Sequence, residues 1–307
     1  MSFIDELKSK YTKKRLNKIK QLEMSVNNEK GAIKSNDSSP EIFSVNKKTP
    51  LRGFPALLSI GKNIEYNFKS IKNNPTIPKV TASDNFIEEF ENYAKSMGIT
   101  AIGYAKVPSE VIFKDKAILY DNAIVFTKEI DKIQVDNELP GKSATDLKLY
   151  DKLGKITNEL ADYLRENGFG AHASHPAVGS VTYPTLGQYA SLGWRGKSNL
   201  LITPELGPRQ KISAVFTSIE NLPIKEDNEH SWIADYCQTC GKCIKKCPSD
   251  AIMEIESSDG YNGTKLMSSL CRGCYESCTI CMKECPFNNR EYTKIKNRFE
   301  KIQQNKK

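Results

Sequence analysis

Cysteine spacing constrains this chain more than any other feature, because all nine cysteines fall within 49 positions near its C-terminal end. The first run reads CQTCGKCIKKCP from Cys237, and the second reads CRGCYESCTICMKECP from Cys271. Each run closes with C-x2-C-x3-C-P, the spacing with which bacterial ferredoxins bind iron–sulfur clusters. Two residues between successive thiolates let one short loop reach adjacent iron corners. The sequence therefore predicts two [4Fe–4S] clusters.

The last cysteine of each run indicates which cysteines bind which cluster, because in two-cluster ferredoxins the cysteine before the proline binds the other cluster. We expect the first cluster to use Cys237, Cys240, Cys243 and Cys285. We expect the second to use Cys247, Cys278, Cys281 and Cys271, with Cys274 as the alternative to Cys271. Ferredoxin spacing would place a ligand at position 275, where the chain has Tyr275, so the second run is irregular and one cysteine is spare.

Two other uses of cysteine fit less well. Zinc sites typically use two C-x2-C pairs separated by a longer loop, not quadruplets that each end in Cys-Pro. Disulfides are disfavoured by the odd number of cysteines, by their tight spacing and by an N-terminal segment that does not read as a secretion signal.

Composition and charge indicate a globular protein of the cytoplasm. Hydrophobic residues make up 38% and charged residues 27%, and no stretch approaches the ~20 apolar residues of a membrane helix. The first 20 residues hold neither an apolar signal region nor a twin-Arg pair. The net charge of +8 is concentrated at both ends, with nine Lys/Arg against four Asp/Glu in 1–34 and seven against two in 290–307. Because no stacking motif accompanies them, we favour solvated helical ends over a nucleic-acid partner.

The pattern along the chain predicts an α+β protein in four parts. These are a helical, Lys-rich region at 1–78, an α/β core at 79–227, a double-cluster domain at 228–290 and a basic tail at 291–307. Helical periodicity covers 3–22 and 54–73, and Pro75 and Pro78 then break the pattern.

Within the core, the sequence predicts two helices, two strands and a hairpin. One helix is capped at Ser83 or Asp84 and ends at Gly98, and a longer one covers 143–167. The segments ITAIGYAKV and NAIVFTKEI read as strands. The segments NLLITPELG and QKISAVFTSI read as a β-hairpin around PELGPR.

Two segments before and within the first cysteine run carry a family resemblance. ASLGWRGKSNLLITPELGPRQKISAVFTSIENLP, followed by DYCQTCGKCIKKCPSDAI, resembles the cobamide-dependent reductases. These are the epoxyqueuosine reductases and the catalytic subunits of reductive dehalogenases. The resemblance covers roughly residues 80–290. It implies a nitroreductase-like core with an appended ferredoxin-type two-cluster domain.

The resemblance also implies a function. An oxidoreductase of this type would pass electrons from ferredoxin or flavodoxin through two clusters to a base-off corrinoid, and would reduce a small or modified substrate. The alternatives are an electron-transfer protein, or a reductive activator of another corrinoid protein without an organic cofactor of its own. The acidic residue of epoxyqueuosine reductases would fall near Ala177, but no Asp or Glu lies between Glu166 and Glu205. The proton donor of that reaction is therefore missing.

Candidate site residues follow from the loop between the core helix and the first cysteine run. Tyr183 or His175 could donate a proton, and His172 lies three residues before His175 in what reads as a Gly/Pro loop. We expect the cofactor contacts to come from the glycines and cations of the LGWRGK element, which are Gly193, Arg195, Gly196 and Lys197.

Overall fold

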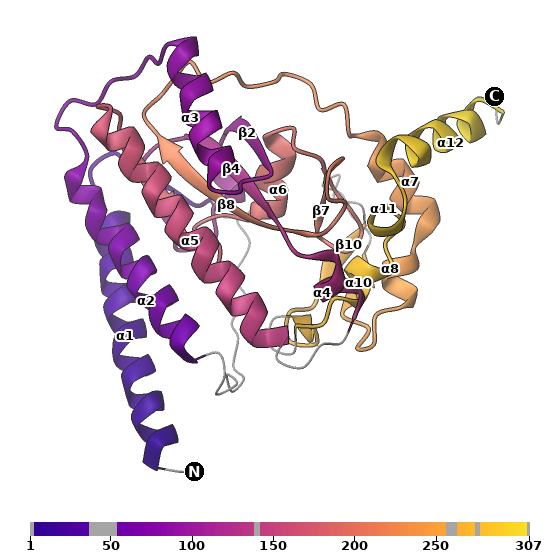
Figure 1. The fold of residues 1–307 in the computed structure, drawn as a ribbon, viewed down its shortest axis with the longest axis horizontal. Coiled ribbons are helices and arrows are strands. Elements are labelled where there is room, and N and C mark those ends of the chain that lie inside the picture. Colours follow the sequence, from indigo (N-terminus) through magenta and orange to yellow (C-terminus); the bar gives the residue numbers. More distant parts are fainter. Residues whose placement is uncertain (1–2, 37–53, 138–141, 256–262, 274–276, 306–307) are drawn as a thin grey trace.

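A four-stranded antiparallel sheet with strand order β2–β4–β8–β5 lies at the centre of the chain (Figure 1). The computed structural model describes residues 3–36, 54–137, 142–255, 263–273 and 277–305. The strands are β2 (Ala101–Lys106), β4 (Asn122–Glu129), β8 (Gln210–Thr217) and β5 (Ala171–Ser174). The two central strands are β-branched and almost wholly buried, as expected for strands covered on both faces.

Helices cover one face of this sheet, and a shorter helix with irregular chain covers the other. Helices α3 (Asp84–Ser96) and α5 (Lys142–Glu166) pack on the first face, where Ile124 and Phe126 of β4 point. Helix α6 (Tyr183–Tyr189) packs on the second face, where Val125 points. Alternate residues of one strand thus enter two separate cores, as the two-residue repeat of a strand requires.

Helix α2 (Phe54–Lys69) lies alongside α5, and helix α1 (Phe3–Asn27) lies alongside α2 (Figure 1). A small apolar cluster of Ile19, Ile60 and Ile64 joins them, with Leu147 of α5 packed against it. Glu65 accepts hydrogen bonds from Arg15 at 3.3 Å and from Lys18 at 2.5 Å. Hydrogen bonds from Lys18 and Lys69 lower the pKa of Glu65 to about 2. Apolar packing therefore attaches the helical region predicted at 1–78 to the core, and the Glu65 contacts join α1 to α2.

The remaining elements are short. In the core they are β1 (Ile33–Lys34), two 3-10 turns (Ser70–Asn73 and Ser109–Val111), β3 (Ala117–Ile118), α4 (Lys132–Asp136), β6 (Trp194–Arg195) and β7 (Leu201–Ile202). After the core come α7 (Trp232–Cys240), α8 (Lys242–Lys245), β9 (Ile252–Glu254), β10 (Thr264–Leu266), α10 (Ile280–Lys283), α11 (Pro286–Asn289) and α12 (Tyr292–Gln304). We call the described residues of 232–305 the cysteine lobe.

Helix boundaries predicted for the core are confirmed. The hydroxyl of Ser83 accepts a hydrogen bond from the backbone N–H of Phe86 and caps α3. Gly98 and Gly168 follow α3 and α5 with φ values of +84° and +88°, a left-handed conformation that glycine adopts without steric cost.

The hairpin predicted around PELGPR is wrong. Strand β7 pairs with β6, through Leu201 opposite Arg195, and not with β8. Strand β8 instead lies between β4 and β5. A bridge between Thr203 and Gly207 closes a tight turn, so the chain leaves one small sheet before it enters the central one. The presence of two apolar segments on either side of a turn is therefore not enough to predict that these segments pair with each other.

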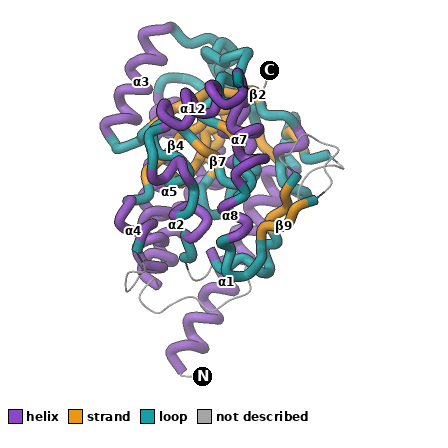
Figure 2. Tube along the Cα trace, turned by 90° about the vertical axis from the view of Figure 1, so that its right-hand side faces the viewer, coloured by secondary structure: helices purple, strands orange, loops and turns teal. Residues whose placement is uncertain are grey.

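Two further segments differ from the sequence reading. His172 does not lie in a loop, because it occupies β5 opposite Phe216 of β8. The basic tail predicted at 291–307 contains helix α12, as expected of a helical end, but its Tyr292 and Phe299 rings pack against Trp232 instead of being fully solvated. Figure 2 shows α12 close to α7, which begins with Trp232. None of the described helices combines the length and apolar character that a membrane crossing needs.

Candidate iron–sulfur site and core pocket residues

Two short helices bring the first three cysteines of run one to a common cavity. Helix α7 ends at Cys240, and Gly241 then adopts φ +58°, which turns the chain directly into α8. Cys285 arrives from the second run at the residue that precedes α11. One cavity is lined by Cys237, Cys240, Cys243 and Cys285 together with Lys197, Ser198, Ile202, Tyr236, Gly241, Lys242, Pro286 and Phe287. The structure thus brings together the four cysteines that the spacing grouped.

The second group of cysteines also gathers in space. Burial, together with the neighbouring thiols of Cys271, Cys278, Cys243 and Cys247, raises the pKa of Cys281 to about 12. The sulfur of Cys247 accepts a hydrogen bond from the backbone N–H of Ala251 at 3.2 Å. Cys274, the alternative ligand, lies outside the described residues. Among the described side chains, no three of His, Cys, Asp or Glu are set to hold a single metal ion.

Burial controls the charge state of these thiols. It raises the pKa of Cys237 to about 12 and that of Cys243 to about 11. Burial also raises the pKa of Cys285. These thiols therefore keep their protons at neutral pH unless a cation compensates the thiolates, and metal binding to them releases protons. This donor set suits an iron–sulfur cluster, whose irons supply that compensation.

The LGWRGK element joins the core to this cavity and does not present an open face. A Cβ added at Gly193 would lie 2.1 Å from the backbone oxygen of Ile202, so the glycine lets β6 approach β7. A Cβ at Gly196 would lie 2.7 Å from the Ile202 side chain and 3.4 Å from the Cys237 sulfur. The backbone N–H of Lys197 donates a hydrogen bond to that sulfur and lowers the pKa of Cys237.

The two cations of the element also have partners inside the protein. Lys197 is 6% exposed, and its Nζ lies 2.9 Å from Glu254 Oε1. Arg195 Nη1 donates to the Thr185 hydroxyl at 3.3 Å. The four residues predicted to contact a cofactor therefore also contact β7, α6 and the cysteine lobe, and their role as cofactor contacts stays a prediction.

Tyr183 and His175 lie together, but both are committed to internal contacts. The Tyr183 hydroxyl donates to the backbone oxygens of Ser174 at 2.8 Å and His175 at 3.0 Å, and burial raises its pKa. His175 is 1% exposed, and its Nδ1 accepts a hydrogen bond from the backbone N–H of Ala177. Burial lowers the pKa of His175 to about 3. Both groups therefore make contacts inside the protein, and their role as proton donors stays a prediction.

A lysine side chain lies over the ring of a different tyrosine. Lys211 Nζ, on β8, lies 4.0 Å from the ring centroid of Tyr150 on α5 and 2.8 Å from Asp146 Oδ1. Burial alone would lower the pKa of Lys211, but Tyr150 and Asp146 together hold it above its usual value. Sequence reasoning missed this pair because the two residues are 61 positions apart and belong to a helix and a strand. Only the packing of α5 on β8 brings them together.

Known proteins resemble both parts of the chain. The family described as 4Fe-4S binding domain matches residues 230–253. Tetrachloroethene reductive dehalogenase of Desulfitobacterium hafniense is 30% identical over 159 residues, which are 50% of this chain and 27% of that protein. Epoxyqueuosine reductase of Cyclobacterium marinum is 33% identical over 111 residues, 32% of this chain and 34% of that protein. The chain is a homologue of both reductases. These matches span about a quarter to a third of the relatives' own length.

The fold is shared with a solved reductive dehalogenase. The catabolic enzyme NpRdhA superposes with a TM-score of 0.60 at 17% identity, over 89% of this chain and 45% of that one. The mixed helix-and-sheet fold and the 4Fe-4S binding motif are therefore those of this group of reductases. An epoxyqueuosine reductase has been solved with a tRNA stem loop, but its TM-score of 0.46 is too low to bear on this chain's partners.

Proposed function

We propose that this chain is an iron–sulfur reductase that passes electrons through two [4Fe–4S] clusters to a site in its core. The observation that carries the proposal is the cavity lined by four cysteines from two separate runs. Cys285 reaches this cavity from the second run, as the Cys-Pro ligand of a two-cluster ferredoxin does. The remaining cysteines would hold the second cluster, with Cys271 or Cys274 as its last ligand.

The proposed core is nitroreductase-like, and we propose a corrinoid as its cofactor on the ground of the relatives. One solved relative is described as a reductive dehalogenase with B12-dependent dehalogenation, and it matches this chain with a TM-score of 0.61. A bound corrinoid would supply a strongly reducing metal centre. Because residues 193–197 contact the protein itself, we assign none of them to the corrinoid.

Tyr150 is the proton donor that we propose for the core reaction. Reductive dehalogenases, which this chain resembles, use a tyrosine that a basic residue supports. Lys211 beside Tyr150 provides that arrangement here. Lys211 places a positive charge over the Tyr150 ring, and the ion pair with Asp146 holds the lysine there. The substrate would be a small or modified molecule that accepts two electrons and this proton.

Metal analysis of anaerobically purified protein tests the electron path. We expect about eight irons and about eight acid-labile sulfides per chain, with cobalt bound after growth with cobalamin. Zinc in place of iron, or about four irons, would contradict the two-cluster proposal. Tyr150→Phe should lower the reduction of a probe such as 3-bromo-4-hydroxybenzoate or tetrachloroethene, while Tyr183→Phe lowers stability and leaves turnover per folded chain unchanged.

A second function is favoured by the internal contacts of residues 193–197. A chain without an organic cofactor would act as an electron-transfer protein or as the reductive activator of a separate corrinoid protein. It would contain iron without cobalt, and it would reduce cobalt only after a corrinoid protein is added. An electron donor such as ferredoxin or flavodoxin serves either function.

A further inference from the structure

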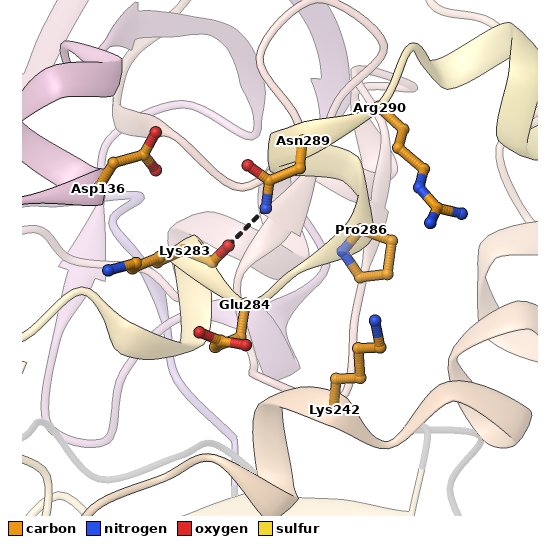
Figure 3. A pocket seen from close by; sticks show the side chains of 7 residues that line it. All are labelled: Asp136, Lys242, Lys283, Glu284, Pro286, Asn289 and Arg290. Carbon is orange, nitrogen blue, oxygen red and sulfur yellow. Dashed lines mark hydrogen bonds between the residues drawn. The ribbon is translucent and has the colours of Figure 1, made fainter.

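A surface pocket of about 350 Å³ adjoins the first cysteine cavity, and Figure 3 shows the side chains that line it. It is lined by Asp136, Lys242, Lys283, Glu284, Pro286, Asn289 and Arg290. Lys242 and Pro286 line both the pocket and the cysteine cavity, so the two share a wall. Lys242 directly precedes Cys243, and Pro286 directly follows Cys285. A molecule in this pocket is therefore one residue away from two of the proposed cluster ligands.

The pocket carries a surplus of positive charge. Lys242, Lys283 and Arg290 are exposed, and within the described part of the chain none of their side chains is engaged in an ion pair. Of the two carboxylates, Asp136 is already engaged, because it pairs with Lys132 and accepts a hydrogen bond from Asn288 at 2.9 Å. Burial alone would raise the pKa of Asp136, but the hydrogen bonds from Lys132 and Asn288 and the charges of Lys132 and Lys283 hold it below its usual value.

The surrounding lobe has the same sign. Residues 232–255, 263–273 and 277–305 hold eleven Lys/Arg and six Asp/Glu. The basic side chains of the pocket come from three short elements that also carry or flank cluster ligands, namely α8, α10 and the end of α11. The positive field is thus centred where electrons would enter the first cluster, and a negatively charged partner would be steered to it.

We propose that this pocket is the docking site of an acidic one-electron carrier protein that reduces the first cluster. The proposal rests on the proposed function, since it requires a cluster on Cys237, Cys240, Cys243 and Cys285. In the step, the carrier is oxidised by one electron and the cluster is reduced by one electron, and no proton or covalent bond is exchanged.

The shape of the pocket favours a protein over a small anionic substrate. Small-molecule sites bury ~70–90% of their ligand and present a few converging polar groups from a largely apolar wall. Here all three cations of the lining and Asn289 are exposed, and of the polar lining residues only Asp136 and Glu284 are half-buried. Pro286 is the one apolar lining residue. Exposed cations around a shallow opening are typical of a transient protein contact that depends on charge.

Cluster reduction by flavodoxin hydroquinone, a small acidic probe, tests the site. The variant Lys242→Gln/Lys283→Gln/Arg290→Gln removes three charges at the pocket. The matched control, Lys20→Gln/Lys62→Gln/Lys72→Gln, removes three exposed charges from the N-terminal helical region, which is far from the pocket in sequence. We expect the second-order rate of cluster bleaching at low salt to fall about tenfold or more in the pocket variant and to change less than twofold in the control.

A salt series and a second reductant distinguish a loss of docking from a loss or change of the clusters. The wild-type rate should fall steeply between about 20 and 300 mM salt, and the pocket variant should lose most of that dependence. Reduction by the methyl viologen radical cation, which needs no acidic docking face, should be as complete in the variant as in the wild type. Equal losses with flavodoxin in the pocket variant and the control overturn the docking site. Absence of iron and sulfide from the wild type overturns the proposed function instead.

Discussion

Two buried histidines make the folded core sensitive to acid, and His175 allows the effect to be calculated. Burial lowers its pKa to about 3, although the charge of Asp151 would raise it. In the unfolded chain the same group has a pKa of about 6.5. Between these values the unfolded state binds the proton and the folded state does not, so the free energy of unfolding falls as pH falls below 6.5. From pH 7 to pH 5 the loss is about 2 kcal/mol for this one residue.

The variant His175→Asn isolates this contribution. An asparagine oxygen can still accept the hydrogen bond from Ala177, but it does not titrate. The variant should be less stable than the wild type at pH 7, and the difference should shrink by about 2 kcal/mol at pH 5 because only the wild type loses the histidine term.

Urea unfolding under anaerobic conditions, followed by far-UV circular dichroism at pH 5, 6 and 7, measures this difference. Effects of pH on the cysteine lobe cancel, because both proteins share them. The control Leu153→Ala opens a cavity in the neighbouring helix α5 and should cost ~2–5 kcal/mol at every pH. A His175→Asn difference that stays constant from pH 7 to pH 5 would refute the assignment of a neutral, buried histidine.

Two further outcomes are expected. Gly193→Ala forces a Cβ to 2.1 Å from the Ile202 backbone oxygen, so it should lower the stability measured by thermal unfolding by ~2 kcal/mol or more. An unchanged melting temperature together with a lost cofactor would instead support the ligand contact predicted from sequence. Cys285→Ala should reduce the iron and sulfide content by about half. Cluster reconstitution in the wild type should be faster at pH 8.5 than at pH 7, because the buried thiols must lose protons. Equal rates at the two pH values would contradict the raised pKa values.

Local rules accounted for much of the fold. The cap at Ser83, the glycines after α3 and α5, and the β-branched strands each depend on a few adjacent residues, and the structure has them where the sequence places them. Pairing between segments depends on more. Strand β8 fits between β4 and β5 because its residues fill both cores, and no feature of the turn before it contains that information.

The same distinction applies to the candidate site. Cysteine spacing is local, so the ligand groups can be read from it. The pairing of Tyr150 with Lys211 depends on how α5 lies across β8, and the sequence offered Tyr183 instead because it is near the recognisable motif. Proximity in sequence to a motif was a poor guide, since Tyr183 uses its hydroxyl to hold the chain around Ser174 and His175.

The LGWRGK element links the core to the first cysteine cavity through close packing and a backbone hydrogen bond. Its glycines let β6 lie against β7, and its lysine backbone donates a hydrogen bond to Cys237. Ile202 of β7 packs in the same apolar cluster as Cys237 and Cys285. A larger residue at either glycine would therefore displace the first cysteine cavity from the core. In the function that we propose, the element would fix the distance between the first cluster and the core.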